Sequence, residues 1–194
     1  MNKKYILLIL FVAVALIQLW VPTQMIWKSE AVLKEGKIFR FKTAPIDPVD
    51  PFRGKYVTLT FEVDAAISTP DTLWEKDEWA YVMLGSNSEG FAEIESIHKT
   101  RPENTSDYFK TTVRYTGKRK SGSNVHLRFP FDRYYMEESK AYEAELAVRE
   151  SAQDSSQVAY ALVSIKDGDA RLVDVIVNEV PLKEWVEQLM EETE

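Results

Sequence analysis

The first part of the chain is almost uniformly apolar, whereas the rest mixes apolar and polar positions. Only Gln18 interrupts the apolar run from Tyr5 to Val21, which follows two lysines. An apolar helix needs about 20 residues to cross a hydrocarbon core of ~30 Å, and this run reaches that length by extending through residue 26. The pattern predicts one transmembrane signal-anchor over residues 5–26, embedded in the lipid bilayer.

The residues around this segment predict its orientation. Lysines beside a first span favour the cytoplasmic side of a membrane. Residues 1–4 are therefore expected in the cytoplasm and the C-terminal part outside it, in a single-pass protein of the cell membrane. Trp20 and Trp27 fall near the far interface, where indole rings prefer to lie. Residues 27–36 predict a short helical stalk, which Gly36 is expected to end in the left-handed conformation of a helix C-cap.

A cleaved signal peptide is the alternative for the same segment. Ala13-Val14-Ala15 supplies a small-x-small triplet of the kind that a signal peptidase recognises. Cleavage there would leave an apolar stretch from Leu16 to Val21 exposed to water, so the pattern favours an uncleaved anchor. The chain has no cysteine, which excludes a thioether lipid anchor, disulfides and thiolate metal sites.

Beyond the stalk, short stretches rich in β-branched and aromatic residues alternate with turn signals, as in antiparallel sheets. The strongest hairpin signal is Asp167-Gly168, which separates two such stretches. One expected strand begins near Ile38, and a second covers residues 55–63, where the alternation puts Val57, Leu59 and Phe61 on the core face. The further strands form three pairs: 79–84 with 91–98, 109–115 with 125–129, and 158–166 with 169–177.

Two further helices are predicted. Residues 135–150 are rich in alanine, glutamate and leucine and contain neither glycine nor proline. Behind Pro181, apolar residues recur at helical spacing as far as Met190. The whole pattern predicts an α+β fold: a mainly antiparallel β domain over residues 37–194 with one inserted and one C-terminal helix, preceded by a single N-terminal transmembrane helix.

Composition narrows the chemistry. With a net charge of −7 and a pI near 5.1, the chain lacks the concentrated basic face that nucleic acids require, so no nucleic-acid partner is expected. His98 and His126 are the only histidines and have no evident third ligand for a metal. Core packing explains the aromatic residues between 129 and 135 better than a ligand groove does. We expect no catalytic site, no cofactor and no metal.

The segment from Phe39 to Phe61 is the most unusual, because it joins a proline-rich loop directly to a strand. The prolines of residues 45–51 exclude a helix or a central strand there. Arg53 can reach the carboxylate of Asp47 or Asp50 with its planar fork. This junction is either a structural clip or a preorganised loop that presents side chains to a partner. A calcium site is a poor third alternative, because the loop offers too few oxygen ligands.

The end of this segment resembles a known family. An arginine precedes Gly54, and Tyr56, Leu59 and Phe61 follow at the spacing of the Gly-Asp-Tyr-x-x-Leu-x-Tyr signature of the membrane-anchored GDYXXLXY proteins of bacteria. Lys55 stands where the signature has aspartate, and Phe61 where it has the final tyrosine. The resemblance implies an anchored, extracytoplasmic domain, often encoded beside a polytopic membrane protein, and transfers no catalytic residue.

A second phrase, Arg-Gly-x-Tyr-Val-x-Leu, is similar to a strand of the type I signal peptidases. Those enzymes pair a serine nucleophile with a lysine base. Ser29 and Ser68 lack the sequence context of that nucleophile, so a peptidase-like scaffold without the catalytic pair is the remote alternative.

These observations predict a non-enzymatic accessory or interaction subunit of a membrane complex, with a polytopic membrane protein as the implied partner. The alternative is a module that binds a small ligand or an envelope polymer. The candidate partner-binding residues are Asp47, Asp50, Phe52, Arg53, Gly54, Tyr56, Leu59 and Phe61.

Overall fold

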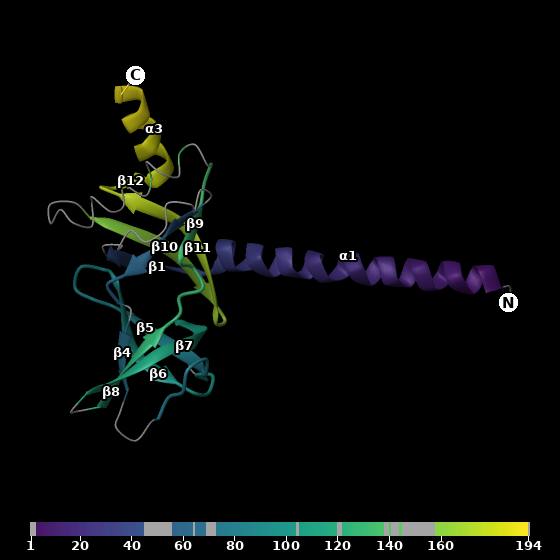
Figure 1. Cartoon of the computed structure of the whole chain (residues 1–194), viewed down its shortest axis with the longest axis horizontal. Helices are drawn as coiled ribbons and strands as arrows, with labels where there is room; N and C mark the ends of the chain where they lie inside the picture. The colour runs from purple at the N-terminus through teal and green to yellow at the C-terminus, as the bar shows by residue number, and fades with distance from the viewer. Residues whose placement is uncertain are drawn as a thin grey trace.

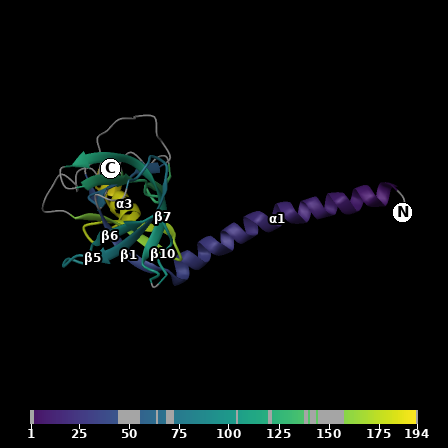
Figure 2. The same ribbon diagram turned by 90° about the horizontal axis from the view of Figure 1, so that it is seen from below.

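A long N-terminal helix projects from a β-rich domain (Figures 1 and 2). The computed structural model describes residues 3–44, 56–63, 65–68, 73–103, 105–119, 122–137, 140, 144 and 158–193. Helix α1 (Lys3–Glu35) is the one helix among them that is long and apolar enough to cross a membrane, and the domain buries none of its most apolar window. The apolar run therefore forms a free-standing helix, not a core helix of a soluble protein.

Twelve described strands and a C-terminal helix form the domain. They are β1 (Lys37–Ala44), β2 (Tyr56–Thr58), β3 (Thr60–Phe61), β4 (Ala65–Ser68), β5 (Trp79–Ser86), β6 (Ala92–His98), β7 (Tyr108–Arg119), β8 (Gly122–Leu127), β9 (Arg133–Tyr135), β10 (Ala159–Lys166), β11 (Asp169–Val177), β12 (Val180–Pro181) and α3 (Leu182–Thr193).

The strands form two five-stranded sheets and one two-stranded ribbon. One sheet has the order β12-β11-β10-β1-β3, and the other has the order β4-β8-β7-β5-β6, below it in Figure 1. All ladders between these strands are antiparallel. The predicted α+β class is confirmed, and so are the three predicted strand pairs.

The predicted strand over residues 55–63 is divided between two partners. β2 pairs with β9, whereas β3 pairs with β1. Between them, the backbone N–H of Leu59 donates a 2.8 Å hydrogen bond to the carbonyl of Asp132. The strand thus crosses from the ribbon to a sheet, while its alternation persists: Val57, Leu59 and Phe61 are all buried, as predicted for the core face.

Aromatic rings fill the interior between the sheets. Phe41, Phe61, Phe129 and Phe131 pack with ring centres 4.9–6.1 Å apart, mostly edge to face. Such pairs contribute beyond the area that they bury. Phe129 and Phe131 therefore belong to the core, as the packing interpretation predicted. Tyr135, in contrast, remains largely exposed.

The predicted start of the inserted helix at residue 135 is wrong. Tyr135 is the last residue of β9, where it pairs with Tyr56, so residue 135 is in a strand. Lys140 and Ala144 are helical, and the rest of residues 138–150 lies outside the described residues. Lys140 contacts α3 through a 2.7 Å ion pair with Glu187.

The prediction that the stalk helix ends at Gly36 is confirmed, but the predicted left-handed conformation of Gly36 is wrong. Helix α1 does end at Glu35, but Gly36 does not have a positive φ. A Cβ atom at this position would lie 2.2 Å from the Oγ atom of Ser164 and 2.5 Å from the carbonyl oxygen of Val32. Glycine is required here because the helix end lies directly against β10.

Candidate functional site

The structure describes three of the eight motif residues: Tyr56, Leu59 and Phe61. Asp47, Asp50, Phe52, Arg53 and Gly54 lie outside the described residues.

The three remaining motif residues have different environments. Leu59 and Phe61 are buried, whereas Tyr56 is partly exposed. The Tyr56 ring packs against Tyr135, with ring centres 5.7 Å apart, and the guanidinium of Arg133 lies 5.1 Å from the centre of the Tyr56 ring. Of these three residues, Tyr56 packs within the two-stranded ribbon, and Leu59 and Phe61 belong to the core.

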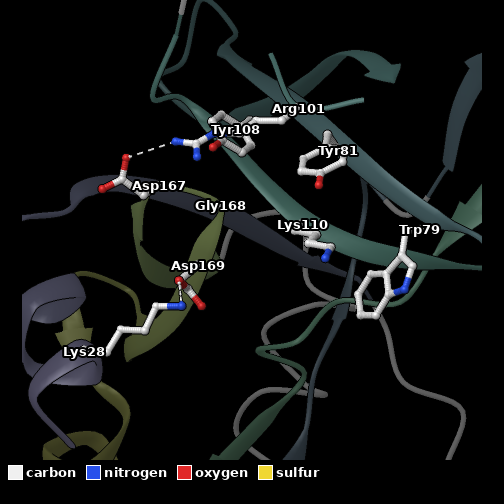
Figure 3. Close-up of a pocket in the computed structure, with 9 residues that line it drawn as sticks. All are labelled: Lys28, Trp79, Tyr81, Arg101, Tyr108, Lys110, Asp167, Gly168 and Asp169. Atoms are coloured by element: carbon white, nitrogen blue, oxygen red, sulfur yellow. Dashed lines mark ion pairs between the residues drawn. The ribbon is translucent and has the colours of Figure 1, made fainter. Parts of the chain in front are cut away.

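A cleft of about 350 Å³ lies elsewhere, where the base of α1 meets the two sheets. We call it the helix-base cleft. It is lined by Lys28, Trp79, Tyr81, Arg101, Tyr108, Lys110, Asp167, Gly168 and Asp169 (Figure 3).

The tip of the β10–β11 hairpin builds one wall of the helix-base cleft. At this tip, the carbonyl of Gly168 accepts a 2.8 Å hydrogen bond from the backbone N–H of Lys110, and Gly168 forms an isolated parallel bridge with Phe109. These contacts join the tip to β7 and so connect the two large sheets. Asp167 and Gly168 both have positive φ, as expected for a tight hairpin turn.

Tyr108 fits closely against this turn. A Cβ atom at Gly168 would lie 2.9 Å from the Cε2 atom of Tyr108, so only glycine leaves room for the ring. Tyr108 is 1% exposed, and its hydroxyl has no hydrogen-bond partner in the described part of the chain. An unpaired buried hydroxyl is costly, which makes this group unusual in the cleft wall.

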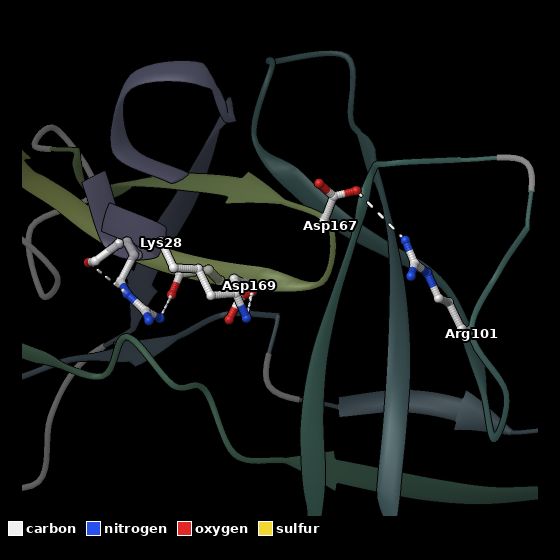
Figure 4. A network of polar contacts seen from close by, with 7 residues as sticks. Lys28, Arg101, Asp167 and Asp169 are labelled. Carbon is white, nitrogen blue, oxygen red and sulfur yellow. Dashed lines mark hydrogen bonds and ion pairs between the residues drawn. The ribbon is translucent and has the colours of Figure 1, made fainter. Parts of the chain in front are cut away.

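The base of α1 forms the second wall. The Nζ atom of Lys28 lies 2.6 Å from the Oδ2 atom of Asp169 (Figure 4). On the next residue of the helix, the hydroxyl of Ser29 accepts a 3.2 Å hydrogen bond from the Nε atom of Arg171. The helix is thus attached to the strand that follows the hairpin tip.

The third wall consists of aromatic rings with a cation over them. The Nζ atom of Lys110 lies 4.1 Å from the centre of the Trp79 ring and 5.9 Å from that of Tyr81 (Figure 3). Trp79 is 56% exposed, so its ring presents apolar surface beside this cation. Among the described residues, Lys110 has no carboxylate within ion-pair distance.

Arg101 closes the far end of the helix-base cleft. Its guanidinium lies 3.7 Å from a carboxylate oxygen of Asp167 and 5.9 Å from the centre of the Tyr108 ring. The described lining thus carries three cations and two carboxylates, and each carboxylate is paired with a cation. Lys110 is the remaining positive charge, so the arrangement suits an anionic group beside aromatic surface.

Sequence reasoning identified the Asp167-Gly168 turn but missed the cleft. The available signal is the position of Trp79 and Lys110 at the starts of the predicted strands 79–84 and 109–115. No local pattern shows that a hairpin tip will contact β7 and the base of a helix more than 130 residues earlier in the chain.

The histidines lie apart from the helix-base cleft. The Nε2 atom of His98 is 2.8 Å from the hydroxyl of Ser96, and the His126 ring stacks on Tyr115 with centres 4.1 Å apart. Within the described ranges, no three histidine or acidic side chains are grouped closely enough to hold a metal ion.

Comparison with protein families gives one match. The model of the GDYXXLXY protein family matches residues 18–175, so the chain belongs to this family. The match includes the last part of α1 and extends into β11. No curated protein and no solved structure matches the chain.

Proposed function

We propose that this member of the GDYXXLXY family is a membrane-anchored binding protein, a non-enzymatic accessory subunit that engages its partner at the helix-base cleft. In this proposal α1 crosses the cell membrane, the N-terminus lies in the cytoplasm, and the β-rich domain lies outside. The family match and the apolar helix support the anchored domain.

The observation that carries the proposal is the position of Lys28. This residue lines the helix-base cleft, and only Trp27 separates it from the end of the expected span over residues 5–26. A helix rises about 1.5 Å per residue, so Lys28 lies within a few ångströms of the hydrocarbon boundary. In this proposal the helix-base cleft therefore opens beside the membrane surface, where a membrane-bound partner can contact it.

The attachment of the helix favours a fixed orientation of the domain over a flexible tether. The buried hydroxyl of Ser164 donates a 2.6 Å hydrogen bond to the carbonyl of Val32, and Lys166 pairs with Glu35. Together with the contacts of Lys28 and Ser29, these bonds follow the last two turns of α1. A fixed domain presents the same face to a neighbouring membrane protein each time.

The lining favours binding over chemistry. Its described side chains are cations, aromatic rings and paired carboxylates, and none is a serine, threonine, cysteine or histidine. Cations and aromatic rings are frequent at binding sites because they give both charge and contact area. The non-enzymatic part of the proposal would be overturned by peptide hydrolysis that substitution of a single serine abolishes.

Site-specific photo-crosslinking in native membranes tests this proposal. A photoreactive phenylalanine analogue replaces Tyr81 in the full-length protein, and the matched control replaces Tyr115, which is exposed on β7 away from the cleft. We expect an adduct from position 81 and none from position 115. Equal labelling at both positions, or none at either, would contradict binding at the helix-base cleft.

The mass of the adduct separates the accessory subunit from the second candidate function. A protein adduct supports docking to a membrane protein, whereas an adduct of small mass or a ladder of polymer masses supports a ligand-binding module. The observation that favours this second candidate is Lys110, a cation without a paired carboxylate beside two aromatic rings.

A further inference from the structure

The geometry points to a lipid ligand: we propose that the helix-base cleft holds the phosphate group of an anionic phospholipid from the membrane that anchors the chain, with Lys110 as its principal cation. This inference rests on the membrane anchoring of the proposed function and names the ligand class of its second candidate, the ligand-binding module, at the same site.

The first argument is depth. The polar headgroup layer adds about 5–7 Å on each side of the hydrocarbon core. Lys28 stands two residues beyond the end of the expected span, about 3 Å along a helix axis. The cleft wall that contains Lys28 therefore lies at headgroup depth. A phospholipid reaches it without leaving the bilayer, whereas a soluble ligand must pass between headgroups.

The second argument is charge. Three cations and two carboxylates leave the described cleft with one positive charge, which complements a lipid headgroup with one negative charge. Lys28 and Arg101 are held by Asp169 and Asp167, so Lys110 is the cation that can pair with a phosphate oxygen without breaking an existing ion pair. Lysine is a common phosphate ligand because it offers a compact charge with three donors.

The third argument is the aromatic wall. Trp79 and Tyr81 combine apolar rings with polar groups, and such side chains are enriched at membrane interfaces. The exposed ring of Trp79 is suited to contact with glycerol and the upper acyl chain. Lys110 over the Trp79 ring then holds the charge next to this surface.

The volume of the helix-base cleft and the unpaired hydroxyl of Tyr108 agree with a phospholipid headgroup as the ligand. A volume of about 350 Å³ is at the small end of the usual range for ligand pockets and accommodates a headgroup. The buried Tyr108 hydroxyl in the same wall has no acceptor in the described part of the chain, and a phosphate oxygen within hydrogen-bond distance would supply one.

Lysine reactivity in lipid nanodiscs tests the inference on the full-length protein. Two preparations contain phosphatidylcholine alone or phosphatidylcholine with phosphatidylglycerol, and an amine-reactive reagent followed by mass spectrometry reports the labelling rate of each lysine. We expect phosphatidylglycerol to lower the rate at Lys110 severalfold. Lys99 is the internal control, because its Nζ atom also lies over a tryptophan ring, 5.2 Å from the centre of Trp74, but outside the cleft.

A third preparation, phosphatidylcholine with added inorganic phosphate, separates the lipid from a free anion. Protection of Lys110 by inorganic phosphate equal to that by phosphatidylglycerol would overturn the lipid assignment. Equal rates at Lys110 in all three preparations would overturn it too. In either case the crosslink at position 81 still tests the proposed binding function on its own.

Lys110→Gln and Lys99→Gln give a second readout by native mass spectrometry of the released protein. A hydrogen bond to a charged group corresponds to about a tenfold change in affinity. The ratio of phosphatidylglycerol-bound to free protein is therefore expected to be about tenfold lower for Lys110→Gln than for the wild type. Lys99→Gln should retain it as the wild type does. Equal retention by both variants would contradict the role of Lys110.

Discussion

Lys28 on α1 and Asp169 on β11 form a 2.6 Å ion pair that joins the N-terminal helix to the hairpin at the helix-base cleft. The Lys28 side chain is 66% exposed, and exposed ion pairs contribute only about 0.2–1 kcal/mol. The pair therefore adds little to overall stability. Its role is geometric, because it lies beside the hydrogen bonds that Ser29 and Val32 form with the same sheet.

Loss of these contacts should loosen the domain on the helix. We expect the double variant Asp169→Asn, Ser164→Ala to broaden the distance distribution between spin labels at Met25 and Glu93, measured by electron paramagnetic resonance in nanodiscs. The matched control is Lys34→Gln, which removes an ion pair between Lys34 and Glu30 within α1. An unchanged width in the double variant would show that other contacts orient the domain.

Gly168→Ala should destabilise the domain through both backbone and packing. A positive φ of 87° costs a residue with a Cβ atom about 1–2 kcal/mol, and the new methyl would also displace Tyr108. Gly90→Ala isolates the backbone cost, because Gly90 has a φ of 82° and open space around it. Gly117→Ala carries neither cost. Urea unfolding should show the largest loss of unfolding free energy for Gly168→Ala, a smaller loss for Gly90→Ala and the smallest for Gly117→Ala. Equal losses for the variants at 168 and 90 would mean that the Tyr108 ring moves aside at no cost.

Gly36→Ala should separate the end of α1 from β10. The added Cβ atom would clash with the Oγ atom of Ser164 on β10 and lie 3.0 Å from the carbonyl oxygen of Ile165, which is backbone and cannot swing away as a side chain can. We expect faster hydrogen exchange at the amides of residues 36 and 164, with the rest of the domain protected as in the wild type. Exchange at wild-type rates would show that the helix end adapts without loss of contact.

The signature leucine is expected to act through the core. Leu59 is 2% exposed, so Leu59→Ala should lower the free energy of unfolding by about 2–5 kcal/mol. Tyr56→Phe is the control, because it removes a hydroxyl from a partly exposed ring on the opposite face and should change stability by about 0.5 kcal/mol or less. A Leu59→Ala variant as stable as the wild type would argue for a binding role of this position.

Tyr134 should make stability fall at high pH. Burial raises the pKa of Tyr134 to about 12 from its ordinary value of 10.0, with further contributions from the charge and hydrogen bond of Asp174. The folded protein keeps this proton between those values while the unfolded chain loses it. The contribution is therefore fully present below pH 10 and is lost as pH rises through the folded pKa.

The test follows the urea midpoint against pH. From pH 10 to 12 the midpoint of the wild type should fall more steeply than that of Tyr134→Phe. Tyr135→Phe, which changes an exposed ring on the next residue, should keep the wild-type slope. Parallel slopes for all three proteins would contradict the raised pKa.

The sequence alone predicted the elements whose signals are local. The apolar run identified α1, the Asp167-Gly168 turn identified the β10–β11 hairpin, and the alternation at residues 57, 59 and 61 identified the core face of the motif. Each of these depends on periodicity or turn chemistry within a few residues. The family signature was likewise readable, because a motif is itself a local pattern.

Tertiary structure decided where these elements meet. The split of the motif strand between β9 and β1, the close approach at Gly36 and the assembly of the helix-base cleft all depend on contacts between distant parts of the chain. Lys28 and Asp169 are 2.6 Å apart only because two sheets pack and a hairpin tip bonds to β7. Periodicity determines which face of an element is buried, but the choice of partner depends on the packing of the whole core, which no local pattern encodes.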